Sequence, residues 1–171
     1  MFDLIKSVEE LDRIRDECKK LVTTRSAASA AAAAVPVPGA DVAVDIGILM
    51  ELIPSINRRF GLSHEQVEAL DHQLKAKLVV IITSVGNDLI GSVVTKKAVM
   101  AILKKVGVRV AAKSVGKYLP IVGTALASSI SFGAMKWMGN THVDDCYEAA
   151  RRMLTERTSN TSGADAAIIP A

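Results

Sequence analysis

Apolar residues recur at helical spacing through most of the chain. Between residues 3 and 22 they follow steps of three and four, which predicts an amphipathic helix with a charged opposite face. The alanine-rich stretch 26–34 predicts that this helix continues, because alanine is the best helix former. The charged face is expected to be solvated, and the alternative is pairing with a partner helix in a short coiled coil. We therefore expect an N-terminal amphipathic helix over residues 1–34.

Two prolines and a glycine then make the clearest break in the pattern. Proline fixes φ, glycine permits a sharp turn, and aspartate is a good N-cap. A structural turn is expected at Pro36, Pro38, Gly39 and Asp41. The apolar spacing after it predicts a helix over about residues 41–60, bent at an internal proline and ended by Gly61.

Two further helices are predicted from local signals. Ser63 and Gln66 have the spacing of a capping box, which indicates a helix start. The β-branched run Val79–Thr83 has the composition of a strand, but no partner strand with turn chemistry lies nearby, so a helix is expected. His64 and His72 lie in exposed phases without ligands at suitable spacing, so no metal site is expected.

Positive charge is concentrated in one block. Residues 89–143 hold seven Lys, one Arg and no acidic residue, whereas residues 1–88 hold 10 basic and 13 acidic residues. A helix here with one cationic and one apolar face is typical of membrane-surface helices, and the alternative is a core helix whose lysines face water. Contact with a membrane or an anion is predicted for Lys96, Lys97, Lys104, Lys105, Arg109, Lys113, Lys117, Lys136 and Trp137.

An uncharged run of 18 residues, Tyr118–Met135, follows. It is at the short end of a bilayer span, which takes roughly 17–25 residues, and it is rich in small side chains. A buried central helix and conditional membrane insertion both remain open. Lys136–Asn140 is expected to end this helix, and Thr141 or Asp144 to cap a last amphipathic helix. Residues 159–171 are expected to form a flexible tail.

Nothing in the sequence indicates an active site. It contains no P-loop, dinucleotide-binding, nucleophile-elbow or HExxH motif, so neither an enzyme nor a cofactor is expected. Cys18 and Cys146 are far apart and predict buried free thiols. Scarce arginine and aromatic residues in the basic block argue against nucleic-acid binding. The charged N-terminus has no secretory hydrophobic region, which favours a cytoplasmic protein, with peripheral membrane contact left open.

The motif VPVPGADVAVDIGILMELIPSINRRFGLS, and later YLPIVGTALASSISFGAMKWM followed by DDCYEAARRML, resemble the helical region of immunity-related GTPases and of related bacterial membrane-associated proteins. The resemblance covers roughly residues 35–154. It implies an all-helical region that packs against a GTPase domain and assists oligomerisation and membrane association. The sequence has no GTPase motif, so a GTPase partner is expected to be a separate chain.

The patterns together predict an all-α bundle of about six to eight helices around a small-residue central helix, with a helical domain over residues 35–158. The expected function is a non-enzymatic interaction module that associates with an anionic membrane, a protein partner or another copy of itself. One alternative is a membrane-active bacterial effector, either a pore-forming toxin or its immunity protein. Another is a soluble oligomeric scaffold that uses the first helix as a zipper.

Overall fold

The computed structural model describes residue 5 and residues 7–33, 40–113 and 122–165, with side chains for 5, 7–31, 43–104 and 132–157. This part of the chain contains helices and no strand, which confirms the predicted all-α class. The helices are α1 (Val8–Ala33), α2 (Ala40–Arg59), α3 (His64–Glu68), α4 (His72–Val85), α5 (Lys96–Lys113) and α6 (Val122–Asp165).

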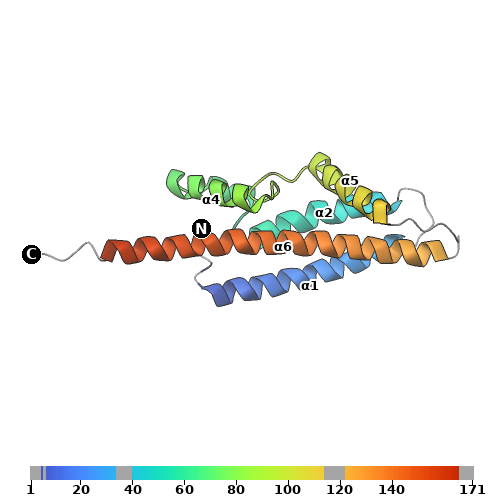
Figure 1. The fold of residues 1–171 in the computed structure, drawn as a ribbon, viewed down its shortest axis with the longest axis horizontal. Helices are drawn as coiled ribbons and strands as arrows, with labels where there is room; N and C mark the ends of the chain where they lie inside the picture. The colour runs from blue at the N-terminus through green and yellow to red at the C-terminus, as the bar shows by residue number, and fades with distance from the viewer. Residues whose placement is uncertain (1–4, 6, 34–39, 114–121, 166–171) are drawn as a thin grey trace, which may run out of the picture.

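The longest helix, α6, is the element against which α1, α2 and α4 pack, whereas α5 packs mainly on α2. Its 44 residues give a length of about 66 Å at roughly 1.5 Å per residue. Figure 1 shows α1 and α2 lying along it, with α4 and α5 towards its two ends. α1 and α6 run antiparallel, because Arg15 contacts Asp144 whereas Val22, later in α1, meets Gly139, earlier in α6.

The predicted break at Lys136–Asn140 is wrong, since α6 runs through it and neither Thr141 nor Asp144 begins a helix. Gly139 has a packing role instead. A Cβ atom on this residue would lie 2.7 Å from Cγ1 and 2.9 Å from Cγ2 of Val22. The missing side chain therefore lets α1 approach α6 closely. α6 also continues to Asp165, so residues 159–165 of the expected tail have helical backbone.

The main hydrophobic core lies between α1, α2, α4 and α6. Leu11, Cys18 and Val22 of α1 are fully buried in one cluster with Val143 and Cys146 of α6. Both cysteines are buried free thiols, as predicted. α1 extends to Ala33, as the alanine-rich sequence predicted. In the described part of α1, the apolar stripe that the scaffold alternative would use as a zipper is buried in this core.

The turn after α2 follows from its sequence. Gly61 has φ 72°, its N–H donates to the Arg58 carbonyl at 3.2 Å, and the Leu62 N–H donates to the Asn57 carbonyl at 2.8 Å. This is a Schellman motif, which satisfies the carbonyl groups at the helix end. The capping box of α3 is present, as predicted: Ser63 Oγ accepts from the Gln66 N–H, and the Gln66 side chain accepts from the Ser63 N–H.

Of the four residues expected to form the turn before α2, Pro36, Pro38 and Gly39 lie outside the described residues. Asp41 is the second residue of α2 and not the residue before it. Two acidic residues of this helix bind α1: Asp45 accepts a hydrogen bond from Ser29 Oγ, and Glu51 accepts one from Arg25. The acidic groups of α2 therefore join it to α1.

The two helices with weaker sequence signals form as expected. α4 contains the β-branched run Val79–Thr83, and its Leu78 and Ile81 are buried in the main core. α5 is continuous through Gly107. Its Val99 is fully buried in a second, smaller cluster with residues of α2 and α6. α5 thus attaches to the body on the side away from α1.

Candidate functional site

The predicted anion-contacting residues separate into several groups in the structure. Lys96, Lys97 and Lys104 are exposed on α5, and no ion pair is found for them within the described residues. The side chains of Lys105, Arg109 and Lys113 and all of Lys117 lie outside the described residues. The structure therefore leaves the first three lysines available to a negatively charged surface.

Lys136 and Trp137 of α6 have different surroundings. The Nζ atom of Lys136 is 5.6 Å from the centre of the Phe132 ring. Trp137 is 52% exposed and lines the cleft described below. Trp137 therefore lines the cleft, whereas Lys136 contacts the Phe132 ring of its own helix.

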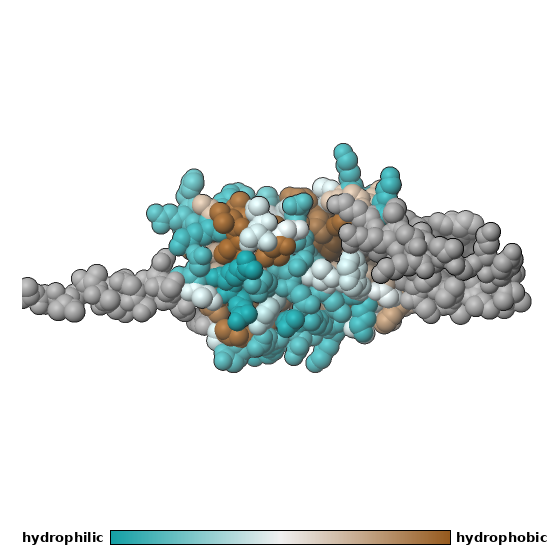
Figure 2. Space-filling view, in the orientation of Figure 1, coloured by the Kyte–Doolittle hydropathy of each residue, from teal (hydrophilic) through white to brown (hydrophobic). Residues whose placement is uncertain are grey.

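Large apolar side chains are exposed beside these lysines. Met100 of α5 is 51% exposed, and Val93, just before α5, is 63% exposed. A second apolar area lies on α4, where Val79 and Val80 point to solvent. Figure 2 shows hydrophobic surface over α4 and next to α5 within an otherwise mainly hydrophilic face. The α5 side of the molecule is therefore both basic and apolar at its surface.

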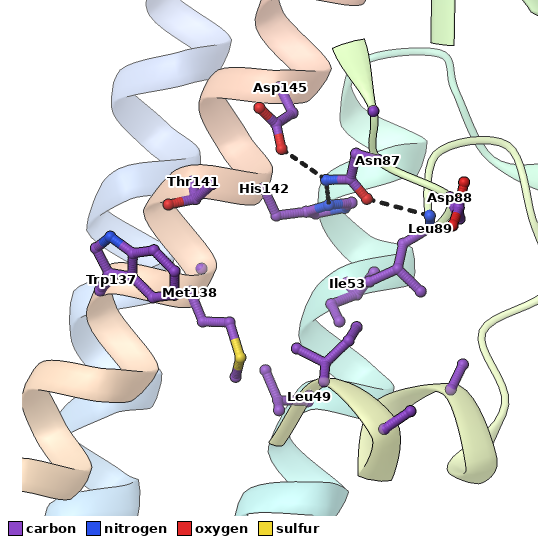
Figure 3. A pocket seen from close by; sticks show the side chains of 15 residues that line it. Leu49, Ile53, Asn87, Asp88, Leu89, Trp137, Met138, Thr141, His142 and Asp145 are labelled. Carbon is purple, nitrogen blue, oxygen red and sulfur yellow. Dashed lines mark hydrogen bonds between the residues drawn. The ribbon is translucent and has the colours of Figure 1, made fainter. Parts of the chain in front are cut away.

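A cleft of about 410 Å³ opens between α5 and α6, and we call it the α5–α6 cleft. Its floor is formed by Leu49 and Ile53 of α2, and its α5 wall by Ala98, Ala101 and Ile102. Trp137 and Met138 line the α6 wall (Figure 3). Asp88 and Asp145 also line the cleft, together with Asn87 and His142. The walls are thus largely apolar, and the ionisable groups lie where the 86–89 loop meets α6.

A buried polar network fixes this loop to α2 and α6. The Nδ2 atom of Asn87 lies 3.0 Å from His142 Nδ1 and donates to Asp145 Oδ2 at 2.8 Å. His142 Nε2 lies 2.9 Å from Asn57 Oδ1. An amide NH₂ only donates and an amide oxygen only accepts, so His142 must accept at Nδ1 and donate at Nε2. The network therefore selects the neutral Nε2–H form of the imidazole.

Burial determines the protonation of these groups. It lowers the pKa of His142 to about 4 and raises the pKa of the Cys146 thiol well above its ordinary value. Burial also raises the pKa of Asp145. Cys146 Sγ lies 3.6 Å from His142 Nε2, but both groups donate to Asn57 Oδ1. A protonated thiol beside an imidazole N–H is not an activated nucleophile, so this arrangement orders the structure.

The sequence analysis did not identify Asn57, Asn87, His142 or Asp145 as site residues. A signal was present for two of them. Asn57 follows the buried Ile53 by four residues, and His142 precedes the buried Cys146 by four. Each is therefore a polar residue on a buried apolar stripe, which requires hydrogen-bonding partners. The position of Asn87 depends on the loop conformation, which spacing along the sequence does not reveal.

The remaining histidines do not form a metal centre. His64 Nδ1 lies 3.2 Å from the Gly91 carbonyl oxygen, and His72 is exposed. Among the residues with described positions, no cluster of three His, Cys, Asp or Glu side chains is placed to hold a metal ion. Within the same residues, none of the helices combines the length and the apolar character needed to span a bilayer.

Similar proteins are found among the interferon-inducible GTPases. Interferon-inducible GTPase 5 of Bos taurus is 27% identical over 149 residues, which make up 86% of this chain and 32% of that protein. The protein of the same name from Rattus norvegicus is 26% identical over the same share. The chain thus spans about a third of the length of these relatives. No family model and no solved structure matches it. The similarity supports a relation to immunity-related GTPases.

Proposed function

We propose that this chain is a non-enzymatic interaction module that associates with anionic membrane surfaces through the exposed face of α5. The observation that carries the proposal is the state of Lys96, Lys97 and Lys104, which are exposed without an ion pair in the described part of the chain. Met100 lies among them as an exposed apolar group. Lysines attract anionic headgroups, and an apolar side chain inserted between lipids adds to the binding.

The distant relation to interferon-inducible GTPases supports an interaction role. We propose that the chain corresponds to the helical part of such a protein and not to its nucleotide-binding part. Its described residues form helices and no strand, and its sequence contains no P-loop motif. A GTPase on a separate chain, or a second copy of this chain, is then a further partner to test. The proposed location is the cytoplasmic surface of a membrane.

The test is co-sedimentation with liposomes that contain either only phosphatidylcholine or phosphatidylcholine with phosphatidylserine. The protein is expected to bind the anionic vesicles and to be released by salt. Each lysine near the surface contributes about 1 kcal/mol, so the triple change of Lys96, Lys97 and Lys104 to Gln should reduce partitioning by roughly 100-fold. Equal binding to both lipids, or to neither, would contradict the proposal.

A matched control removes three exposed cations from elsewhere. Changing Arg13, Lys20 and Arg151 to Gln lowers the net charge by the same amount but leaves α5 intact. If this variant loses binding as much as the α5 variant does, net charge and not the α5 face is responsible. Release of an entrapped dye from the same vesicles would instead identify a membrane-active effector, the alternative suggested by the Tyr118–Met135 run.

A further inference from the structure

Two acidic side chains line the α5–α6 cleft. They are Asp88 and Asp145, and none of the lining residues with described side chains is Lys or Arg. Asp145 accepts a hydrogen bond from Asn87, and no ion pair is found for it or for Asp88 among the described residues. His142 behind them is held in its neutral form by Asn57 and Asn87. Within the part of the chain that has described side chains, the two carboxylates therefore have no neutralising partner in the cleft.

The rest of the cleft suits the apolar part of a small molecule. Leu49, Ile53 and Ile102 contribute aliphatic surface, and Trp137 contributes an aromatic ring. Figure 3 shows Trp137 and Asp145 on the same helix, with Asn87 across from them. A volume of about 410 Å³ is within the range of pockets that hold small ligands.

We propose that the α5–α6 cleft binds a small organic cation, an alkylammonium or arylalkylammonium compound, with its ammonium group towards Asp88 and Asp145 and its apolar part against α2 and α5. Carboxylates provide the charge complementarity, and the apolar floor excludes water from the hydrocarbon part of the ligand. The site goes beyond the proposed membrane association, because it uses other side chains. The Lys96, Lys97 and Lys104 variant should therefore retain it.

Trp137 allows a direct test, because it is the only tryptophan in the sequence. Titration with phenethylammonium should change its fluorescence in a saturable way. The neutral analogue 2-phenylethanol should bind roughly tenfold more weakly, as expected for loss of a charge contact at a partly exposed site. The anionic phenylacetate should bind more weakly still. Equal binding of amine and alcohol, or preference for the anion, would overturn the proposal.

Variants separate the cleft from nonspecific binding. Asp88→Asn should weaken amine binding by several-fold, and the double change with Asp145→Asn should abolish the preference for amine over alcohol. Asp16→Asn, an exposed change on α1, is the matched control and should have no effect. Ala101→Phe should fill the cleft and remove binding of both compounds. If the Asp145 variant does not fold by circular dichroism, Asp88→Asn and Ala101→Phe decide the result; unchanged affinity in both would reject the site.

Discussion

Basic side chains have different surroundings in two regions of the molecule. The first is the contact between α1 and α6, and the second is the attachment of α5 to the body. On α1, the Arg15 guanidinium and the Lys19 ammonium lie 2.6 and 2.9 Å from Asp144 Oδ1 of α6. Tyr147 of α6 donates to Asp12 of α1 at 2.6 Å. On α5, the exposed lysines have no such partner among the described residues. The same residue type therefore joins two helices in one region and is left facing solvent in the other.

The two regions also differ in packing. α1 places fully buried side chains along α6 and approaches it closely at Gly139. α5 contributes Val99 as its fully buried residue within the described side chains, together with the partly buried Leu103. The comparison suggests that the α1–α6 pair supplies most of the stability, whereas α5 supplies surface for binding. Substitutions in the two regions test this distinction.

The largest effect is expected at Gly139. Gly139→Ala places a Cβ atom against both methyl groups of Val22, a β-branched residue that cannot rotate away, and should lower the free energy of unfolding by about 2 kcal/mol. Urea denaturation measures this. Gly133→Ala in the same helix is the matched control; its Cβ would meet nothing within 4 Å, so helix propensity should raise stability by about 1 kcal/mol. Equal effects of both changes would disprove close α1–α6 packing.

A pH-dependent effect is expected from His142. Its pKa is lowered to about 4 from 6.5, so between these values the unfolded chain binds a proton that the native chain does not. Stability is therefore lost as the pH falls. From pH 7 to pH 5 this contribution should fall by about 2 kcal/mol, at roughly 1.4 kcal/mol per unit.

The comparison with His142→Gln isolates this contribution, because all other titrating groups are shared by the two proteins. Denaturant titrations at pH 5, 6 and 7 should show a steeper loss of stability in the wild-type protein than in the variant. The same slope in both proteins would mean that His142 is not held neutral in the native state.

A smaller effect is expected from the ion pairs themselves. Partial burial alone would raise the pKa of the Asp144 carboxyl, but Lys19 and Arg15 lower it below its ordinary value. Asp144→Asn removes the acidic partner of these two residues. Because these groups are partly exposed, the change should cost about 1 kcal/mol, and less at high salt. Lys97→Gln and Lys104→Gln should alter stability by less than about 0.5 kcal/mol. A comparable loss from the α5 changes would remove the contrast between the two regions.

Local signals in the sequence predicted local structure well. The capping box at Ser63, the glycine stop at Gly61 and the alanine-rich extension of α1 depend on interactions within a few residues, and all are present. The β-branched run in α4 was correctly assigned to a helix from the absence of partner strands. The lysines of α5 with described side chains are exposed, as their spacing and the lack of acidic neighbours suggested.

Features that depend on contacts between distant residues were predicted less well. Together with its sequence neighbours, Gly139 predicts the end of a helix. Only the close approach of Val22 from α1 explains why a glycine is needed there. The α5–α6 cleft combines residues from α2, a loop, α5 and α6, so no single segment carries its pattern.

Two hydrogen bonds, one to each backbone polar group of Leu89, hold the loop before α5. The Leu89 carbonyl oxygen accepts from Asn57 Nδ2 at 2.8 Å, and the Leu89 N–H donates to Asn87 Oδ1 at 3.1 Å. Ile90 is then buried in the main core, and the Gly91 N–H donates to the Leu62 carbonyl at 3.0 Å. After Gly91, α5 is attached mainly through the smaller hydrophobic cluster. A partial unfolding event that detaches α5 beyond Gly91 leaves the α1–α6 contact intact, and therefore requires less free energy than global unfolding. Amide hydrogens of α5 should accordingly exchange with solvent faster than those in the middle of α6.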